Sequence, residues 1–439
     1  MKAYTAAAVA ALAAMAEARR CQNLTVPITA SARNGVFNVS TPVTNIDVTN
    51  FILDLTQQGK NYSANTLTGY ATVSGKYNIA ATYCEPDSGP ADTLQILTHG
   101  IGFDRSYWDL PANNYNYSYV KEAVDEYGYS TFTYDRLGIG MSSHGEPVNE
   151  IQAWLEVDAL KELTLMLRAG SVSGISKAYA KTVHAGHSFG SEHTYALTAM
   201  YPNITDAIAL TGFSQNGSFI PYFGLGGNFL QANLNPALTS YVDGYLAASD
   251  QSAVQTNFFA PGAFDPAILA IATSTGQPVT VGELLTIGGE TGSVNHFPDP
   301  VLIITGGRDI PYCGGNCYSA PTGYPNIPST SKNNFPDAKS FQVVIVGEAG
   351  HGLNLEYSHP YTYSEVLNFF LQNVPPGGKA TPEPTTVSAP AQPDKTATGT
   401  EIPAPSTAAA SYATTPSAAA ASEPGHWGQG SWMSKSHGW

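Results

Sequence analysis

The chain has 439 residues, of which 19 are Lys or Arg and 34 are Asp or Glu, so its formal net charge is −15. Charged residues make up only 12% of the chain, about half of the roughly 25% that is usual, whereas the apolar share of 43% is ordinary. This balance excludes a largely disordered chain, and the lack of a basic run argues against a nucleic-acid partner. Asn, Ser, Thr, Tyr and Gly supply the polarity that charge does not, which is typical of a secreted, glycosylated protein.

The first twenty residues have the pattern of a secretory signal peptide. Lys2 precedes a short apolar run at residues 6–16, and Ala16-Glu17-Ala18 matches the small-x-small cleavage pattern. An Ala-rich helix of the folded protein is the alternative, whereas the run is too short for a membrane span. Arg19-Arg20 offers a second, dibasic processing site, so the mature chain is expected to begin between residues 19 and 21. We therefore assign residues 1–20 to a signal peptide and predict an extracellular protein.

Glycosylation sequons follow this leader. Six Asn-x-Ser/Thr triplets predict N-glycosylation, at Asn23, Asn38, Asn61, Asn116, Asn203 and Asn216. Six sequons behind a signal peptide are a stronger indication of secretion than any single sequon, because single ones arise by chance.

Four cysteines allow two disulfides, with three connectivities, in an oxidising compartment. Cys313 and Cys317 enclose a Gly-Gly-Asn segment that can turn tightly, so we expect them to pair. Cys21 then pairs with Cys84. A metal site is the competing interpretation, but no second Cys pair or His pair lies at ligand spacing, so no metal is expected.

Residues 21–374 are expected to form one domain, which is long enough to bury a substantial core. Residues 24–84 are rich in Val, Ile, Thr and Tyr and predict several strands. Further along, short apolar strands alternate with helical patterns; the strands are expected at 94–98, 130–134, 182–185, 207–210, 301–305 and 341–346, and the helices at 150–168 and 190–200. This alternation predicts an α/β fold with a mostly parallel sheet and helices on both faces.

Two segments depart from that alternation. Residues 213–297 contain no Lys or Arg and many Phe and Tyr residues, and we interpret them as a lid inserted between the sixth and seventh core strands. Residues 375–439 are dominated by Pro, Ala, Ser and Thr and predict a disordered tail. The tail lacks the hydrophobic stretch of a lipid-anchor signal.

A Gly-x-Ser-x-Gly motif, Gly186-His187-Ser188-Phe189-Gly190, lies directly between a predicted strand and a predicted helix. The two glycines permit a sharp turn that exposes the Ser188 hydroxyl at the carboxyl edge of the sheet. The N-terminus of the following helix points its dipole and its free N–H groups at the same place. Ser188 is therefore the candidate nucleophile.

Four other motifs follow predicted strands: Thr98-His99-Gly100-Ile101-Gly102, residues 135–142 (DRLGIGMS), Gly307-Arg308-Asp309 and Gly350-His351-Gly352. With these motifs in the order Ser188, Asp309, His351, the chain resembles the α/β-hydrolase superfamily over about residues 75–373. It is similar, more loosely, to secreted fungal serine esterases and lipases in its leader, sequons and tail.

The resemblance and the chemistry together imply a role for each member of the predicted triad. Ser188 would attack a carbonyl carbon, and His351 would take the serine proton and later pass it to the leaving group. Asp309 would orient the imidazole and stabilise its protonated form. Asp299, which lies nearby in the chain, is the alternative acid. Since His351 must be neutral to act as a base, activity is expected to fall at acidic pH.

The oxyanion of the reaction needs N–H donors, and the resemblance assigns them to the backbone of Phe189 and Ile101. Gly102 is the fallback for Ile101 because the register of its loop is uncertain. Losing one such donor typically costs about 10²–10³ in rate.

Other polar residues near these motifs are expected to be structural. Asp135 is interpreted as a loop carboxylate paired with Arg136. His184, His187 and His193 lie near Ser188 in the chain, and we expect them to serve core or loop packing.

The absence of basic residues from the lid disfavours anionic substrates and CoA esters. A neutral, fairly apolar small-molecule ester or lactone is the expected substrate, with no cofactor. A serine peptidase of the same fold and a non-catalytic binding module remain as alternatives. The sequence makes no prediction of the oligomeric state.

Overall fold

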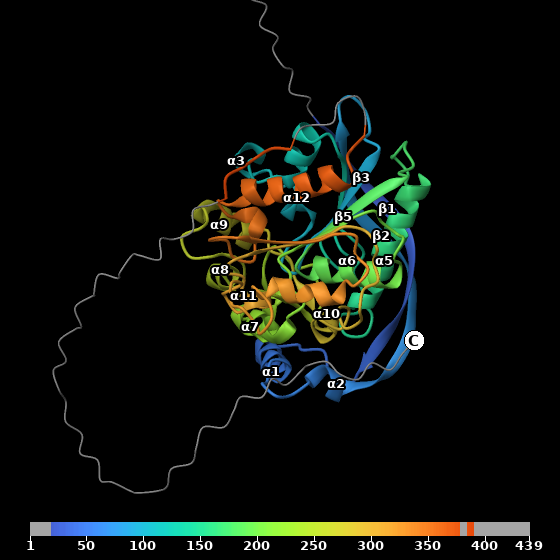
Figure 1. Cartoon of the computed structure of the whole chain (residues 1–439). Helices are drawn as coiled ribbons and strands as arrows, with labels where there is room; N and C mark the ends of the chain where they lie inside the picture. Colours follow the sequence, from blue (N-terminus) through green and yellow to red (C-terminus); the bar gives the residue numbers. More distant parts are fainter. Residues whose placement is uncertain (1–18, 378–383, 390–439) are drawn as a thin grey trace, which may run out of the picture.

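A computed structural model of the chain describes residues 19–377 and 384–389 (Figure 1). The predicted leader up to residue 18 and most of the predicted tail lie outside the described residues.

An eight-stranded sheet forms the centre of the molecule, in the spatial order β1-β2-β4-β3-β5-β6-β10-β11. Neighbouring strands from β4 to β11 are parallel, whereas β1 pairs antiparallel with β2 and β2 pairs antiparallel with β4. This mostly parallel sheet, with its crossover between β3 and β4, confirms the predicted α/β-hydrolase fold. The strands are β1 (Arg19–Phe37), β2 (Leu67–Pro86), β3 (Thr93–Thr98), β4 (Ser130–Tyr134), β5 (Lys181–His187), β6 (Ile208–Thr211), β10 (Val301–Gly306) and β11 (Phe341–Val346).

Helices cover both faces of the sheet, as predicted. Helices α5 (Ala153–Ala169) and α6 (Phe189–Met200) contribute leucines to one apolar cluster, and α12 (His359–Asn373) contributes to another. In β3, Ile96 belongs to the first cluster and its neighbour Leu97 to the second. Because successive side chains of a strand point to opposite faces, the two clusters lie on opposite sides of the sheet. Short helices link these elements: η1 (Arg105–Tyr107), α3 (Ala112–Tyr115), α4 (Tyr119–Lys121), η2 (Glu122–Glu126), α11 (Ile310–Cys313), η5 (Pro328–Asn334) and η6 (Leu353–Leu355).

The N-terminal region differs from the several strands expected over residues 24–84. Strands β1 and β2 pair along their whole length, and the chain between them forms helices α1 (Asn45–Leu55) and α2 (Tyr62–Thr66). Thr44 and Asp47 form a capping box that starts α1. The buried residues of α1 are Val48, Phe51 and Ile52, which have the i, i+3, i+4 spacing of a helix. We call residues 38–66 the N-terminal insert.

A second insertion lies between the sixth and seventh strands of the central sheet, β6 and β10, where the lid was predicted. It contains a three-stranded sheet and several short helices. Its elements are η3 (Gly217–Phe219), α7 (Ile220–Gly226), β7 (Leu230–Gln231), η4 (Ala232–Leu234), β8 (Tyr245–Ala247), α8 (Gln251–Phe258), α9 (Pro266–Ser274), β9 (Val279–Thr280) and α10 (Val281–Thr286). We keep the name lid for residues 213–297.

The first residues of the predicted tail contact the domain. The Pro376 carbonyl accepts hydrogen bonds from the N–H groups of Asp92 and Thr93, at 2.7 and 3.1 Å, at the start of β3. Further on, Thr385 exchanges two hydrogen bonds with the side chain of Asn368 on α12. Backbone contacts with the sheet therefore continue two residues beyond the predicted domain boundary at residue 374.

Candidate active site

Ser188 occupies a sharp turn between β5 and α6. Its φ of 56° and ψ of −120° are unusual for a residue with a side chain. The two glycines of the motif let the backbone close around it: a Cβ atom on Gly186 would lie 2.2 Å from the Gly190 carbonyl oxygen, and one on Gly190 would lie 2.4 Å from the Thr98 carbonyl oxygen. Only glycine fits at either position, so the motif produces the turn that presents the Ser188 hydroxyl.

Ser188, His351 and Asp309 form a chain of hydrogen bonds. His351 Nδ1 lies 2.7 Å from Asp309 Oδ2, and His351 Nε2 lies 2.8 Å from Ser188 Oγ. A carboxylate only accepts, so Nδ1 carries the imidazole proton and Nε2 accepts from the serine hydroxyl. Ser188 is 8% exposed and the other two are almost fully buried. The structure thus brings the three predicted residues together in the geometry of a nucleophile, a base and an orienting acid.

Asp309 is held in place by its own chain segment. It lies three residues after the end of β10, its Oδ1 accepts from the Tyr312 N–H at 2.9 Å, and its Oδ2 accepts from the Thr305 hydroxyl at 2.7 Å. The alternative acid, Asp299, lies before β10, at the opposite end of the strand, in a group with Asp206 and Lys181. Asp309, and not Asp299, is therefore the carboxylate that reaches His351.

The loop that carries His351 depends on a residue that the sequence analysis missed. Glu356 Oε2 accepts from the Gly350 N–H and its Oε1 accepts from the Ala260 N–H, both at 2.6 Å. Burial raises the pKa of Glu356 to about 8, although the two N–H donors oppose this shift. Glu356 thereby connects the histidine loop to the lid. Nothing in its local sequence distinguishes it from a surface glutamate.

Aromatic rings surround His351. The rings of Phe258 and Tyr312 each lie with their centroids 5.8 Å from the imidazole, and the His187 ring lies 4.9 Å away. His187 stacks on Tyr107 at 4.3 Å, and burial lowers its pKa well below the usual value. His187 is therefore a neutral packing residue, which agrees with its predicted role, and it forms part of the wall behind the candidate base.

The predicted oxyanion loop runs against Ser188. A Cβ atom on Gly100 would lie 2.8 Å from the Ser188 Cβ, so Ile101 and Gly102 follow directly after this close approach. His99 orders the loop: its Nε2 accepts from the Arg136 N–H at 3.0 Å, so its Nδ1 carries the proton donated to the Gly100 carbonyl at 2.8 Å. Phe189 is the first residue of α6, so its N–H has no acceptor within the helix. The predicted donors thus lie beside the nucleophile.

Two predicted roles need correction. Asp135 pairs with Arg105, at 2.5 Å, and not with Arg136, its neighbour in the chain. His184 is buried as expected, and its Nε2 lies 3.3 Å from the Thr164 hydroxyl. His193 does more than pack, because its Nδ1 lies 2.7 Å from Glu290 Oε1 and its Nε2 lies 3.3 Å from Glu156 Oε2.

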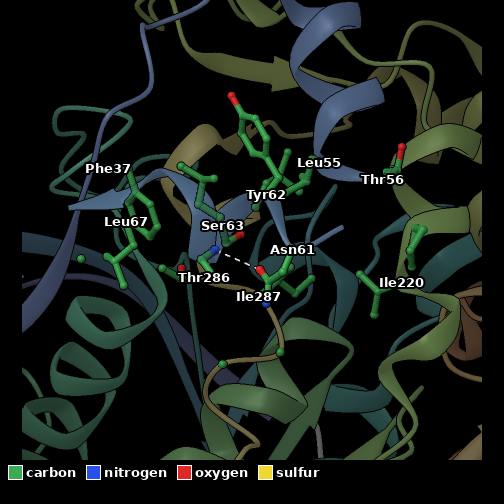
Figure 2. A pocket seen from close by; sticks show the side chains of 18 of the residues that line it. Phe37, Leu55, Thr56, Asn61, Tyr62, Ser63, Leu67, Ile220, Thr286 and Ile287 are labelled. Carbon is green, nitrogen blue, oxygen red and sulfur yellow. Dashed lines mark hydrogen bonds between the residues drawn. The ribbon is translucent and has the colours of Figure 1, made fainter. Parts of the chain in front are cut away.

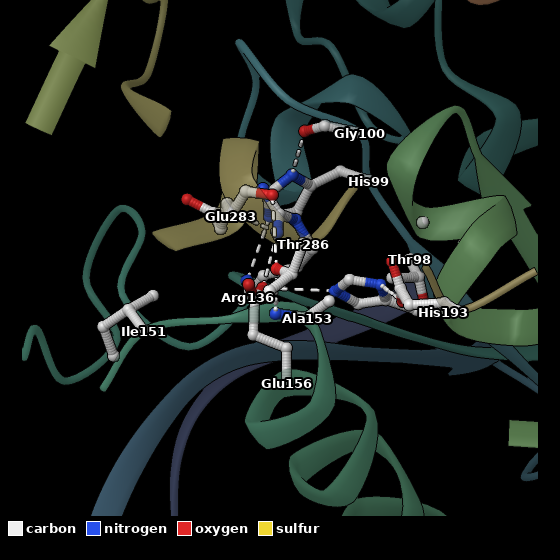
Figure 3. Close-up of polar contacts among 12 residues, drawn as sticks. Thr98, His99, Gly100, Arg136, Ile151, Ala153, Glu156, His193, Glu283 and Thr286 are labelled. Carbon is white, nitrogen blue, oxygen red and sulfur yellow. Dashed lines mark hydrogen bonds and ion pairs between the residues drawn. The ribbon is translucent and has the colours of Figure 1, made fainter. Parts of the chain in front are cut away.

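A buried polar network anchors the lid to the body of the domain (Figure 3). Arg136, in the loop after β4, contacts Glu156 on α5 at 2.5 Å and Glu283 on the lid helix α10 at 2.6 Å. Glu192, in the first turn of α6, accepts from the Gly288 N–H at 2.8 Å. We call Arg136, Glu156, Glu192, His193, Glu283 and Glu290 the anchor network; each is at most 2% exposed.

The aromatic residues of the lid have several different surroundings. Tyr241 and Tyr245 belong to a small cluster of their own and pack against His144. Tyr222 is 49% exposed. Phe223 and Phe258 pack against one another, with centroids 6.1 Å apart, and Phe258 reaches His351. Only part of the aromatic lid therefore lies over the candidate site.

A cavity of about 370 Å³ lies between the N-terminal insert and the lid (Figure 2). Leu55 and Tyr62 from the insert and Ile220 and Ile287 from the lid line it. Phe223 also lines the cavity.

The other predicted sites are placed as follows. Both predicted disulfides are present: Cys21–Cys84 lies across the β1–β2 pair, and Cys313–Cys317 joins the last residue of α11 to the loop that follows it. Five of the predicted glycosylation asparagines are exposed, and the sixth, Asn216, is partly exposed. Within residues 19–377 and 384–389, no group of three or more His, Cys, Asp or Glu residues is arranged to hold a metal ion. The helices in this part of the chain are all too short or too polar to cross a membrane.

The sequence matches no protein-family model and no curated protein. Solved structures resemble the chain at low identity. A thermophilic esterase from Thermogutta terrifontis has 15% identity and a TM-score of 0.45, over 68% of this chain and 94% of the esterase. The enol-lactonase from Burkholderia xenovorans has 15% identity and a TM-score of 0.42, over 66% of this chain and 96% of the lactonase. Est1E from Butyrivibrio proteoclasticus, with ferulic acid bound, has 17% identity and a TM-score of 0.42, over 68% of this chain and 96% of Est1E.

Proposed function

We propose that the chain is a secreted serine hydrolase that cleaves carboxylic esters or lactones of neutral, fairly apolar substrates. The observation that supports this most directly is the hydrogen-bonded chain Asp309–His351–Ser188 at a strand-to-helix turn. A serine hydroxyl is a weak nucleophile at neutral pH and needs a base in this position.

The proposed reaction has two halves. In the first, Ser188 Oγ bonds to the carbonyl carbon while its proton passes to His351 Nε2; the bond to the alcohol oxygen then breaks, and that proton leaves with the alcohol. In the second half, water gives a proton to His351 and its oxygen bonds to the acyl carbon, which releases the acid and returns the proton to Ser188. Asp309 stabilises the imidazolium in each half. The N–H groups of Phe189 and Ile101 would hold the carbonyl oxygen while it carries negative charge.

The charge distribution supports a neutral substrate. The lid contains no Lys or Arg, and two of its acidic residues, Glu283 and Glu290, are buried in the anchor network. A carboxylate or phosphate on the substrate would find no cationic partner in the lid. An uncharged ester avoids this cost.

Secretion is part of the proposal, supported by the exposed sequons and the two disulfides. Arg19 forms ion pairs with Asp109 and Asp125, at 3.4 and 3.2 Å. We therefore propose cleavage after Ala18, which keeps Arg19 in the mature chain. N-terminal sequencing of the secreted protein tests this: a start at Cys21 contradicts it.

The catalytic proposal is tested with a fluorophosphonate probe and an ester panel on the secreted protein. Wild type should be labelled and should hydrolyse p-nitrophenyl esters, whereas Ser188→Ala should do neither. Ser173→Ala, which changes an exposed serine, is the matched control and should behave as wild type. Labelling of Ser188→Ala equal to that of wild type would contradict the proposal. Turnover of peptide p-nitroanilides without turnover of esters would instead favour a peptidase.

A further inference from the structure

The cavity between the N-terminal insert and the lid has an uncharged lining. None of its lining residues is an Asp, Glu, Lys, Arg or His. Its volume of about 370 Å³ falls within the roughly 300–1,000 Å³ that is usual for small-molecule sites. The aliphatic and aromatic lining residues are Phe37, Leu55, Tyr62, Ala64, Leu67, Tyr70, Trp154, Ile220, Pro221, Phe223, Leu284, Leu285 and Ile287.

Three polar groups of the wall already have hydrogen-bond partners within the protein. The Thr56 hydroxyl donates to the Ile52 carbonyl at 2.7 Å, and the Thr286 hydroxyl donates to the Gly282 carbonyl at 2.8 Å. Asn61 Oδ1 accepts from the Ala64 N–H at 2.9 Å. A ligand therefore gains free energy here chiefly by burying apolar surface.

Two contacts place the cavity next to the candidate active site. Phe223, in its wall, packs on Phe258, and Phe258 lies against the His351 ring. On another side, Gly288 lines the cavity and donates its N–H to Glu192, in the helix turn that begins after Ser188. Ser188 itself is not a lining residue. The Phe223 and Phe258 rings, which are 5% and 4% exposed, lie between the two sites, so a substrate bound through its carbonyl at Ser188 would reach the cavity only if these rings moved aside for its side arm.

One wall of the cavity is fixed. Helix α10 is held by the contact of Glu283 with Arg136 and by the capping box of Thr280 with Glu283. The opposite wall belongs to the N-terminal insert, where α2 has only five residues and none of them is buried. The shape of the cavity on that side depends on α2.

We propose that this cavity binds the apolar arm of the ester substrate, and that α2 determines the length of arm that is accepted. The proposal rests on the proposed ester hydrolysis and adds the chemical class and the site of the group that gives specificity. The acyl chain and the alcohol chain are both apolar arms, and the experiment distinguishes them.

Ala64 is an exposed residue of α2 that lines the cavity, so Ala64→Trp is designed to fill part of the cavity from this side. Asn65→Trp is the matched control, because it adds an exposed indole one residue along the same helix, at a residue that does not line the cavity. The kcat/KM values are compared between p-nitrophenyl acetate and p-nitrophenyl octanoate, and between ethyl acetate and octyl acetate. Burial of each methylene is worth roughly fourfold in affinity. Excluding three or more methylenes should therefore lower kcat/KM for the long ester by more than tenfold.

We expect Ala64→Trp, but not Asn65→Trp, to lower kcat/KM for one of the two long esters. The kcat/KM for the matching short ester should stay unchanged. Loss for octanoate assigns the cavity to the acyl arm, and loss for octyl acetate assigns it to the alcohol arm. Equal effects on long and short esters, no effect, or the same effect with Asn65→Trp overturns the proposal.

A second readout separates this proposal from the catalytic one. Binding of N-phenyl-1-naphthylamine, a neutral fluorophore that brightens in apolar surroundings, is measured in a Ser188→Ala background. Binding should be lost with Ala64→Trp and kept with Asn65→Trp, even if the protein hydrolyses no ester. Unchanged binding with Ala64→Trp would overturn the cavity proposal, whereas absent ester turnover by the chain with Ser188 intact would overturn the catalytic proposal.

Discussion

Replacing Arg136 by Met should destabilise the protein more than the loss of any exposed ion pair. The Arg136 guanidinium contacts two glutamates, Glu156 and Glu283, and all three side chains are at most 1% exposed. Met has a similar length but no charge, so the variant leaves two buried carboxyl groups without their cationic partner. Removing one partner of a buried pair typically costs about 3–5 kcal/mol.

The loss should also depend on pH. Burial raises the pKa of Glu156 and of Glu283, each to about 7, while Arg136 opposes the rise. Without Arg136 both pKa values increase further, so the folded variant binds more protons than folded wild type above about pH 7. The unfolded states of the two proteins titrate alike. In that pH range the free energy of unfolding of the variant therefore falls by up to about 1.4 kcal/mol more per pH unit than that of wild type, for each glutamate.

Urea unfolding at pH 5, 7 and 8.5 measures these differences. Arg20→Met is the matched control, because Arg20 forms an exposed pair with Glu85 and its loss should cost about 1 kcal/mol or less at every pH. A second comparison adds Glu156→Gln and Glu283→Gln to Arg136→Met. With the uncompensated charges removed, the triple variant should recover stability relative to the single variant at pH 8.5.

Two results would refute this reasoning. The first is a loss with Arg136→Met that does not exceed the loss with Arg20→Met at pH 7. The second is a loss that is the same at pH 5 and pH 8.5, since it would mean that packing, and not charge, explains the effect.

Four further predictions follow from the site and the surface. Asp309→Asn should lower kcat for ester hydrolysis by about 10⁴ while KM changes little, and a kcat within tenfold of wild type would contradict the assigned role. Gly190→Ala should prevent secretion of folded protein, because its Cβ would overlap a backbone carbonyl; wild-type yield and melting temperature would count against the tight turn. Burial raises the pKa of Glu356 to about 8, so the stability of wild type should fall as pH rises from about 4.5 to 8, and Glu356→Gln should remove this dependence on pH. Urea unfolding of both proteins across this range should show wild type losing up to about 1.4 kcal/mol per pH unit relative to the variant, and a relative gain would contradict it. Ser63→Ala should reduce the mass of the secreted protein by one glycan at Asn61, whereas Ser63→Thr should not; equal masses would show that Asn61 is unmodified.

The sequence allowed us to predict that the three triad residues lie close together, because each of them follows a parallel strand. The carboxyl ends of parallel strands meet at one edge of the sheet, so Ser188, Asp309 and His351 converge although 163 residues separate the first from the last. Their local glycines also mark the turns. The bounds of β4 and β11 match the predicted residues, although only β4 is buried along its whole length.

The anchor network was not predictable, because its contacts join residues that share no local pattern. Arg136 and Glu283 are 147 residues apart, and either residue alone resembles a solvated surface charge. The only signal was indirect: Glu283 and Glu290 are acidic residues in a segment that has no cation of its own. The pairing of Asp135 with Arg105 was missed because adjacency in the chain favoured Arg136.

The aromatic composition of the lid predicted burial but not the neighbours of each ring. Tyr241 and Tyr245 pack in a separate cluster, whereas Phe258 reaches His351. The helices of the N-terminal insert were overlooked because the surrounding residues favour strands. The capping box at Thr44 and the spacing of Val48, Phe51 and Ile52 were the available signals.

The antiparallel pairing of β1 with β2 has a consequence for how this protein can change over evolution. The N-terminal insert leaves and re-enters the sheet at Phe37 and Leu67, which are paired neighbours. A different segment could therefore replace residues 38–66 without moving the ends of either strand, and Cys21–Cys84 would still join them at their far end. The sheet thus fixes where the insert begins and ends, but a replacement segment would also have to fill the core space that Val48, Phe51 and Ile52 occupy.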